Sequence, residues 1–142
     1  MRKPRPVALL AKSMAIRTYR LATTSAVSGT GIATTTVVAN GTIIGFAVSI
    51  TGTGGAAIGH YMNEVALNQT SINNGPVSGA PSEALLGKWG FSFNITTANF
   101  LNVYQPMSRK ITAGNLLCIN QSLIAGTAAT VCSQCIDVFV QE

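Results

Sequence analysis

Few residues of this chain have side chains that could carry out acid–base chemistry. There is one histidine, His60, and the four acidic residues are spread along the chain at Glu64, Glu83, Asp137 and Glu142. A Ser-His-Asp or Cys-His arrangement would have to use His60, and its neighbours form no recognisable catalytic pattern. No two acids are closely paired in sequence, so a two-carboxylate mechanism has little support. We expect no catalytic residue and no enzymatic activity.

The cysteines are the other chemically capable group. Cys132 and Cys135 form a C-x-x-C, but a structural zinc site needs four ligands, and only Cys118 and His60 could complete it. If the segment is a strand, Cys132 and Cys135 point to opposite faces, and no helix follows to activate a redox thiol. The cysteines are also odd in number, so they make no disulfide framework. We expect core or half-buried thiols, a reducing compartment, and neither a metal nor a cofactor.

A glycine-rich turn at Gly52-Thr53-Gly54-Gly55 superficially resembles a dinucleotide-binding turn between a strand and a helix. Its spacing departs from that motif, and no regular alternation of strands and helices follows. We expect a flexible hairpin turn there. Residues 56–67, which come next, fit either a strand, with Tyr61, Val65 and Leu67 on one face, or a helical turn.

Charge is scarce and unevenly placed. Only 9% of the 142 residues are charged, against about 25% in typical proteins. We therefore expect much of the surface to be covered by other subunits, although a surface rich in Thr and Asn that needs no partner is the alternative. Six of the nine basic residues lie in the first twenty positions, at Arg2, Lys3, Arg5, Lys12, Arg17 and Arg20. Such a terminal block is typical of a segment that binds nucleic acid or an acidic surface, although a solvated tail would look the same.

The elements that must position these residues are predicted to be strands. Alternating or β-branched segments predict five strands, at residues 15–27, 32–38, 42–51, 89–97 and 98–107. The last of these is expected to end near Pro106. Asn40-Gly41 predicts a hairpin turn, and residues 83–86 fit a short helix. In residues 89–97 we expect Trp89, Phe91, Phe93 and Ile95 in the core. The longest apolar run, around residues 43–50, is far shorter than the roughly twenty residues of a transmembrane helix.

The end of the chain is predicted to be a hairpin. Residues 116–121 run extended, Ala125-Gly126-Thr127 turns the chain, and residues 130–140 return with Cys132, Ile136, Val138 and Val140 on one face, interrupted only by Gln134. About eight strands with little helix predict an all-β, jelly-roll-like antiparallel sandwich. We assign residues 1–14 to a basic N-terminal arm and residues 15–142 to one sandwich domain. The apolar stretch at residues 7–11 stops at Lys12, so we expect no secretory signal.

The closing pattern Ile111-Thr-Ala-Gly114-Asn-Leu-Leu117, the turn at Gly126-Thr127 and the strand from Cys132 to Val140 resemble the last two strands of small jelly-roll virion proteins of tailed phages. These include capsid cement or decoration proteins and related head or tail accessory proteins. The resemblance covers about a quarter of the chain. It implies a virion protein made in the host cytoplasm, a symmetric oligomer, commonly a trimer, and an arm that reaches neighbouring subunits of the major capsid protein.

Three functional hypotheses follow. In the first, a decoration protein docks its arm residues Arg2, Lys3, Arg5, Lys12, Arg17 and Arg20 on an acidic capsid surface, and the loop residues Asn73, Asn74, Pro76 and Pro81 contact other subunits. In the second, a shell-forming coat protein turns the same arm inward to the genome, and its salt dependence is steep. The third is a receptor- or glycan-binding tail module that uses Trp89, Tyr61 and Tyr104.

Overall fold

The computed structural model describes residues 14–26, 30–53, 59–68, 85–93, 99–126 and 131–142. Within these ranges strands are the only regular secondary structure, and no described segment is a helix that could cross a membrane. The strands are β1 (Ile16–Ala26), β2 (Thr30–Thr36), β3 (Gly41–Thr53), β4 (Gly59–Leu67), β5 (Leu85–Phe93), β6 (Asn99–Ile111), β7 (Leu116–Gly126) and β8 (Val131–Gln141). The all-β prediction is confirmed. The described part of residues 56–67, which the sequence left open between strand and helix, is β4.

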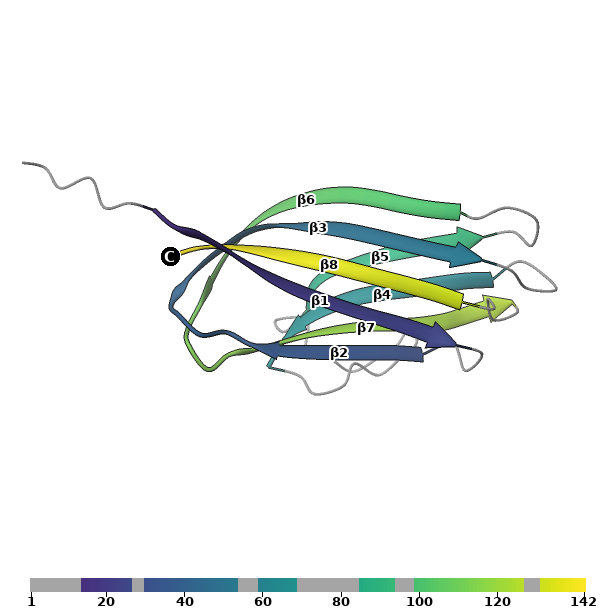
Figure 1. Ribbon diagram of the computed structural model, residues 1–142, viewed down its shortest axis with the longest axis horizontal. Helices are drawn as coiled ribbons and strands as arrows, with labels where there is room; N and C mark the ends of the chain where they lie inside the picture. The colour runs from purple at the N-terminus through teal and green to yellow at the C-terminus, as the bar shows by residue number, and fades with distance from the viewer. Residues whose placement is uncertain (1–13, 27–29, 54–58, 69–84, 94–98, 127–130) are drawn as a thin grey trace, which may run out of the picture.

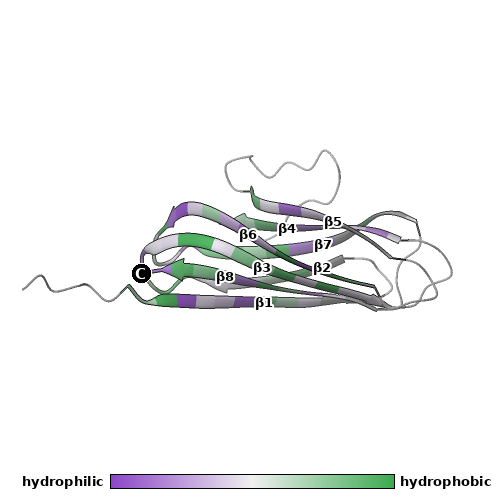
Figure 2. Cartoon of the chain, turned by 90° about the horizontal axis from the view of Figure 1, so that it is seen from above, coloured by the Kyte–Doolittle hydropathy of each residue, from purple (hydrophilic) through white to green (hydrophobic). Residues whose placement is uncertain are grey.

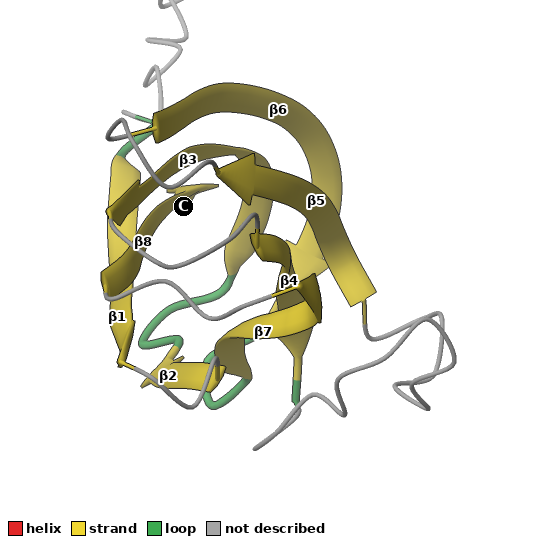
Figure 3. Ribbon diagram, turned by 90° about the vertical axis from the view of Figure 1, so that its right-hand side faces the viewer, coloured by secondary structure: helices red, strands yellow, loops and turns green. Residues whose placement is uncertain are grey.

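The strands form two four-stranded antiparallel sheets that pack as layers (Figures 1 and 3). Sheet A has the order β1-β8-β3-β6, and sheet B has the order β2-β7-β4-β5. Apart from β4 and β5, consecutive strands belong to different sheets. Eight strands connected in this way make a jelly roll, a sandwich built from two Greek keys. The predicted jelly-roll-like sandwich is therefore confirmed, and Figure 2 shows the two layers from above.

The core lies between the two sheets and follows the period-2 pattern of each strand. On β3 the buried side chains are Ile43, Phe46, Val48 and Ile50, and on β8 they are Ile136, Val138 and Val140, as the sequence predicted for that strand. Phe46 meets Trp89 of β5 edge to face, with the ring centroids 5.9 Å apart, so the two sheets contact each other through aromatic rings. On the other side of the sandwich the backbone N–H of Val38 donates to the Tyr19 hydroxyl at 3.0 Å.

Three predicted hairpins are wrong, because the strands they were to join lie in different sheets. Strands β7 and β8 belong to sheets B and A, as do β2 and β3. The stretch Gly52-Thr53-Gly54-Gly55 likewise starts at the end of β3 of sheet A and precedes β4 of sheet B. Instead of sitting in a turn, Asn40 accepts a hydrogen bond through its side-chain oxygen from the backbone N–H of Ala113 at 2.9 Å. Neither Asn40 nor Gly41 has a positive φ. Gly41 is required for close approach, because a Cβ there would lie 2.6 Å from the Gln141 carbonyl oxygen.

Two predicted element boundaries also change. Strand β6 continues through Pro106 to Ile111 instead of ending near the proline. This is possible because β6 is the edge strand of sheet A, where a proline costs no ladder hydrogen bond on its open side. The helix predicted for residues 83–86 is wrong over its described half, because Leu85 begins β5. Trp89 packs against the core as predicted. The side chains of Phe91, Phe93 and Ile95 lie outside the described residues.

Gln134 is a polar side chain in the apolar interior. It is 2% exposed, and neither its amide nitrogen nor its amide oxygen has a hydrogen-bond partner among the described residues. An unsatisfied buried polar group costs about 1–3 kcal/mol. We therefore expect Gln134→Met, which keeps the length of the side chain, to raise the free energy of unfolding by about 1–2 kcal/mol in urea denaturation. An unchanged or lower midpoint would mean that the amide is satisfied in solution.

Candidate interaction surface

Strand β1 is held to the C-terminal strand by two ion pairs. The Arg20 guanidinium makes a two-pronged contact with the Asp137 carboxylate, at 2.7 Å from Nε and 2.8 Å from Nη2. Arg17 pairs in the same manner with Glu142, and the backbone N–H of Glu142 donates to the Ala15 carbonyl at 2.9 Å. Both ends of the described chain therefore lie together at one end of the sandwich (Figure 1).

These contacts lower the pKa of both acidic groups. Hydrogen bonds from Arg20 lower the pKa of Asp137, and hydrogen bonds from Arg17 lower the pKa of Glu142. The same hydrogen bonds raise the pKa of each guanidinium. Arg17 and Arg20, which the sequence assigned to the docking residues of the arm, are thus engaged within the fold.

The depressed pKa of Asp137 predicts a dependence of stability on pH. Because this pKa is lower in the folded state than the value of about 3.9 in an unfolded chain, the ion pair stabilises the fold above that pH. The contribution disappears as pH falls through the folded pKa. We expect Asp137→Asn to lower the melting temperature at pH 7 by a small amount, since Arg20 is largely exposed and solvent screens the pair. The difference in melting temperature from the unmodified protein should shrink as pH falls below about 4, and an equal difference at every pH would contradict the prediction.

A third ion pair lies on sheet B and is far more buried. Lys88 Nζ of β5 lies 2.9 Å from Glu64 Oε1 of β4, and the Glu64 side chain is 3% exposed. Glu64 Oε2 is also buried and has no hydrogen-bond partner among the described residues. A neighbouring pair of buried amides is satisfied, since Gln121 Nε2 donates to Asn63 Oδ1 at 2.9 Å. The sequence did not predict either arrangement.

The outer face of sheet A carries exposed aromatic side chains. Tyr104 of β6 lies across Gly45 of β3, where a Cβ would overlap the Tyr104 hydroxyl. Its ring centroid is 6.3 Å from that of Phe139 on β8. Tyr104 is 59% exposed and Phe100, four residues earlier on the same face, is 74% exposed. Large exposed apolar side chains grouped on one face are typical of a surface that contacts another molecule.

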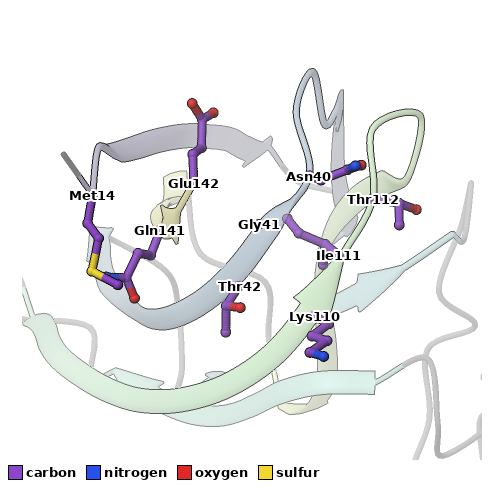
Figure 4. Close-up of a pocket in the computed structure, with 9 residues that line it drawn as sticks. All are labelled: Met14, Asn40, Gly41, Thr42, Lys110, Ile111, Thr112, Gln141 and Glu142. Atoms are coloured by element: carbon purple, nitrogen blue, oxygen red, sulfur yellow. The ribbon is translucent and has the colours of Figure 1, made fainter. Parts of the chain in front are cut away.

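An open pocket of about 460 Å³ lies where the described chain begins and ends. Figure 4 shows Met14 and Gln141 next to each other on one side of it, and the Gln141 amide nitrogen lies 2.8 Å from the Met14 sulfur. Residues 40–42 line it from the start of β3, residues 110–112 line it from the end of β6, and Glu142 follows β8. The pocket has no cluster of acid–base groups, because its acidic residue, Glu142, already binds Arg17.

Most predicted partner-binding residues lie outside the described part of the chain. These are Arg2, Lys3, Arg5 and Lys12 of the arm and Asn73, Asn74, Pro76 and Pro81 of the loop. Of the three residues considered for a receptor- or glycan-binding site, Tyr61 is 1% exposed and Trp89 is partly buried against the core. Only Tyr104 is open to solvent. The three side chains therefore do not form one surface platform.

The structure also separates the residues considered for chemistry. Cys118 lies on β7 in sheet B, where burial raises the pKa of its thiol, whereas Cys135 lies half-buried on β8 in sheet A. In the described ranges no three His, Cys, Asp or Glu side chains come together as a metal site. The next described element after the glycine-rich stretch is the strand β4, and none of the described residues that follow β3 begins the helix that a dinucleotide site requires.

Comparisons with known proteins relate this chain to others by fold. No family model and no curated protein matches the sequence. Among solved structures, dimeric latent PorU from Porphyromonas gingivalis matches with a TM-score of 0.52 and 13% identity over 89% of this chain. This chain spans 13% of PorU. At this identity the likeness establishes a shared β-sandwich fold alone.

Two further matches are weaker. A chain of the human norovirus GI.7 Houston strain VLP matches with a TM-score of 0.42 and 9% identity, over 85% of this chain and 30% of its own length. A family 35 carbohydrate binding module from Clostridium thermocellum matches with a TM-score of 0.37 and 14% identity, over 87% and 90% of the two chains. What the comparisons and the structure establish together is the β-sandwich fold.

Proposed function

We propose that this chain is a structural virion protein, a jelly-roll subunit that builds a protein shell with further copies while its basic arm binds the packaged nucleic acid. The pairing of charges within the fold carries this proposal. Each acidic residue in the described part of the chain, Glu64, Asp137 and Glu142, contacts a basic residue of the fold. None of them is left to neutralise the four basic residues of the arm, Arg2, Lys3, Arg5 and Lys12.

The uncompensated positive charge of the arm points to an anionic partner outside this chain. Each copy carries a net charge of +5, and gathering many copies into one shell concentrates that charge and opposes assembly. Phosphate groups of nucleic acid relieve this repulsion, because lysine and arginine displace condensed counterions from them. Residues 1–14 contain no aromatic side chain, so the arm contacts the phosphate backbone and does not stack on bases.

The arm predicts a specific salt dependence. Four contacts to a duplex oligonucleotide should give a slope of log K against log salt of about −3.6, whereas six would give about −5.4. We expect the shallower slope of about −3.6, because Arg17 and Arg20 already pair with Glu142 and Asp137. Replacing the four arm residues with Gln should remove most of the binding. The matched control, Arg20→Gln, should leave the slope unchanged. Undiminished binding by the four-residue variant would contradict the role of the arm.

A capsid decoration protein is the second candidate, and the exposed aromatic face of sheet A favours it. Phe100 and Tyr104 could pack on a shell made by another protein, with the arm on an acidic surface of that shell. Modest contacts of this kind become effective when many copies bind one lattice. The same four-residue arm variant separates the candidates. A decoration protein would lose its binding to preformed shells while its weak affinity for oligonucleotides stayed the same.

A further inference from the structure

The outer face of sheet A combines a projecting ring with a recess that could receive one. Phe100 projects from β6 with 74% of its surface exposed. On the same face, across β1, β8 and β3, lies a recess of about 250 Å³ lined mostly by small residues, among them Ala22, Ser49 and Cys135, together with Gln134. Small-molecule sites usually measure about 300–1,000 Å³. The recess is below that range and suits a single side chain.

We infer that this face is an isologous interface between two copies of the chain, in which Phe100 of each copy enters the recess of the other. In an isologous pair the same patch serves both partners, so a knob and its matching recess must lie on one face. Sheet A has the order β1-β8-β3-β6. A twofold axis parallel to the strands reverses this order in the second copy and places β6 of one copy over β1 and β8 of the other, where the recess lies.

The strand register brings a second complementary pair together under the same symmetry. Arg20 and Asp137 are directly paired across β1 and β8, Asp137 pairs with Ala47 of β3, and Ala47 pairs with Tyr104 of β6. These four residues form one row across the face. Reversing the row places the Arg20 guanidinium of each copy over the exposed Tyr104 ring of the other. A guanidinium over the face of a tyrosine ring is a favourable contact.

The charges on this face allow it to pack against the same face of a second copy. Arg20 and Asp137 neutralise each other within one copy, so the centre of the face has no net charge that would repel the second copy. Lys110 lies at the margin of the face, on the edge strand β6. The proposed axis carries the two Lys110 side chains to opposite margins. This interface rests on the proposed function, of which it specifies one self-association contact, and nucleic-acid binding by the arm does not require it.

A disulfide test reports this geometry directly. The protein already carries Cys135 in the recess, and Phe100→Cys places a second thiol on the projecting position. Strand β3 separates β6 from β8, so the two positions of one chain lie about 10 Å apart, beyond the reach of a disulfide. We therefore expect oxidation of full-length Phe100→Cys, at a protein concentration high enough to offset the loss of the ring, to give a covalent dimer whose linked peptides contain positions 100 and 135. Adding Cys135→Ser should abolish that linkage.

Two controls make the outcome decisive. Ile32→Cys introduces a thiol at an exposed apolar position of β2 in sheet B, and it should not link to position 135. Phe100→Ala should weaken dimerisation at least tenfold in sedimentation equilibrium, while Ile32→Ala leaves it unchanged. Linkage only between two introduced thiols, or no linkage, would overturn the interface. Particles that bind nucleic acid without the 100–135 disulfide would overturn this inference alone, whereas particles linked in this way without nucleic acid would overturn the proposed function alone.

Discussion

Lys88→Met should lower the free energy of unfolding by about 3–5 kcal/mol, because it leaves a buried carboxylate without its counter-charge. Glu64 is 2% exposed, and Lys88 Nζ at 2.9 Å is its ionic partner in the described structure. The second carboxylate oxygen, Oε2, already has no partner among the described residues. Most of the effect should therefore come from the uncompensated charge and not from lost packing, and chemical denaturation would measure it.

Two companion variants separate these causes. Lys88→Arg keeps the positive charge and should retain most of the stability. Combining Lys88→Met with Glu64→Gln removes the charge from the interior and should recover much of the loss, because a buried neutral amide costs less than a buried carboxylate. If the double variant were as unstable as Lys88→Met alone, packing of the lysine side chain and not its charge would be responsible.

Phe46→Ala should destabilise the fold by about 3–5 kcal/mol, since it opens a cavity between the two sheets. Phe46 is completely buried on β3, and its ring meets Trp89 of β5 at an interplanar angle of 79°. The contact joins β5, an edge strand of sheet B, to the opposite sheet. We expect the midpoint of urea denaturation to fall sharply, while the slope of the unfolding free energy against urea concentration stays unchanged.

The contribution of the aromatic contact can be measured separately. A double-mutant cycle with Trp89→Ala should give a coupling energy of about 0.5–1.5 kcal/mol between the two rings. Phe46→Leu, which keeps part of the apolar volume, should cost less than Phe46→Ala. Additive effects of Phe46→Ala and Trp89→Ala would show that β5 is held by other contacts.

The sequence predicted the strands well, because alternation along one strand is a local property. Ile136, Val138 and Val140 were assigned to the core from their spacing alone, and they are buried on β8. The same spacing cannot tell which sheet a strand joins. Both Asn40-Gly41 and Ala125-Gly126-Thr127 were interpreted as hairpin turns, yet each connection passes from one sheet to the other. In a jelly roll, the sheet that each strand joins depends on contacts between strands far apart in the sequence.

The interaction surface was predictable only in part. The concentration of basic residues before position 21 is visible in the sequence. The engagement of Arg17 and Arg20 instead depends on the pairing of β1 with β8, because their partners lie 125 and 117 residues further along the chain. The exposed apolar face of β6 was detectable in the sequence. Phe100 and Tyr104 are separated by an even number of positions and alternate with Leu101 and Val103, so both faces of this strand are apolar. Two apolar faces on an edge strand indicate one face for the core and one for a partner.

The central claim is that copies of this chain assemble into a shell around nucleic acid held by their arms. The most direct measurement is sedimentation velocity of the purified full-length protein at low and high salt, recorded at 260 and 280 nm. We predict a multi-copy particle that absorbs as nucleoprotein at low salt, and release of the nucleic acid at high salt as phosphate contacts weaken. A monomer free of nucleic acid at both salt concentrations would contradict the account.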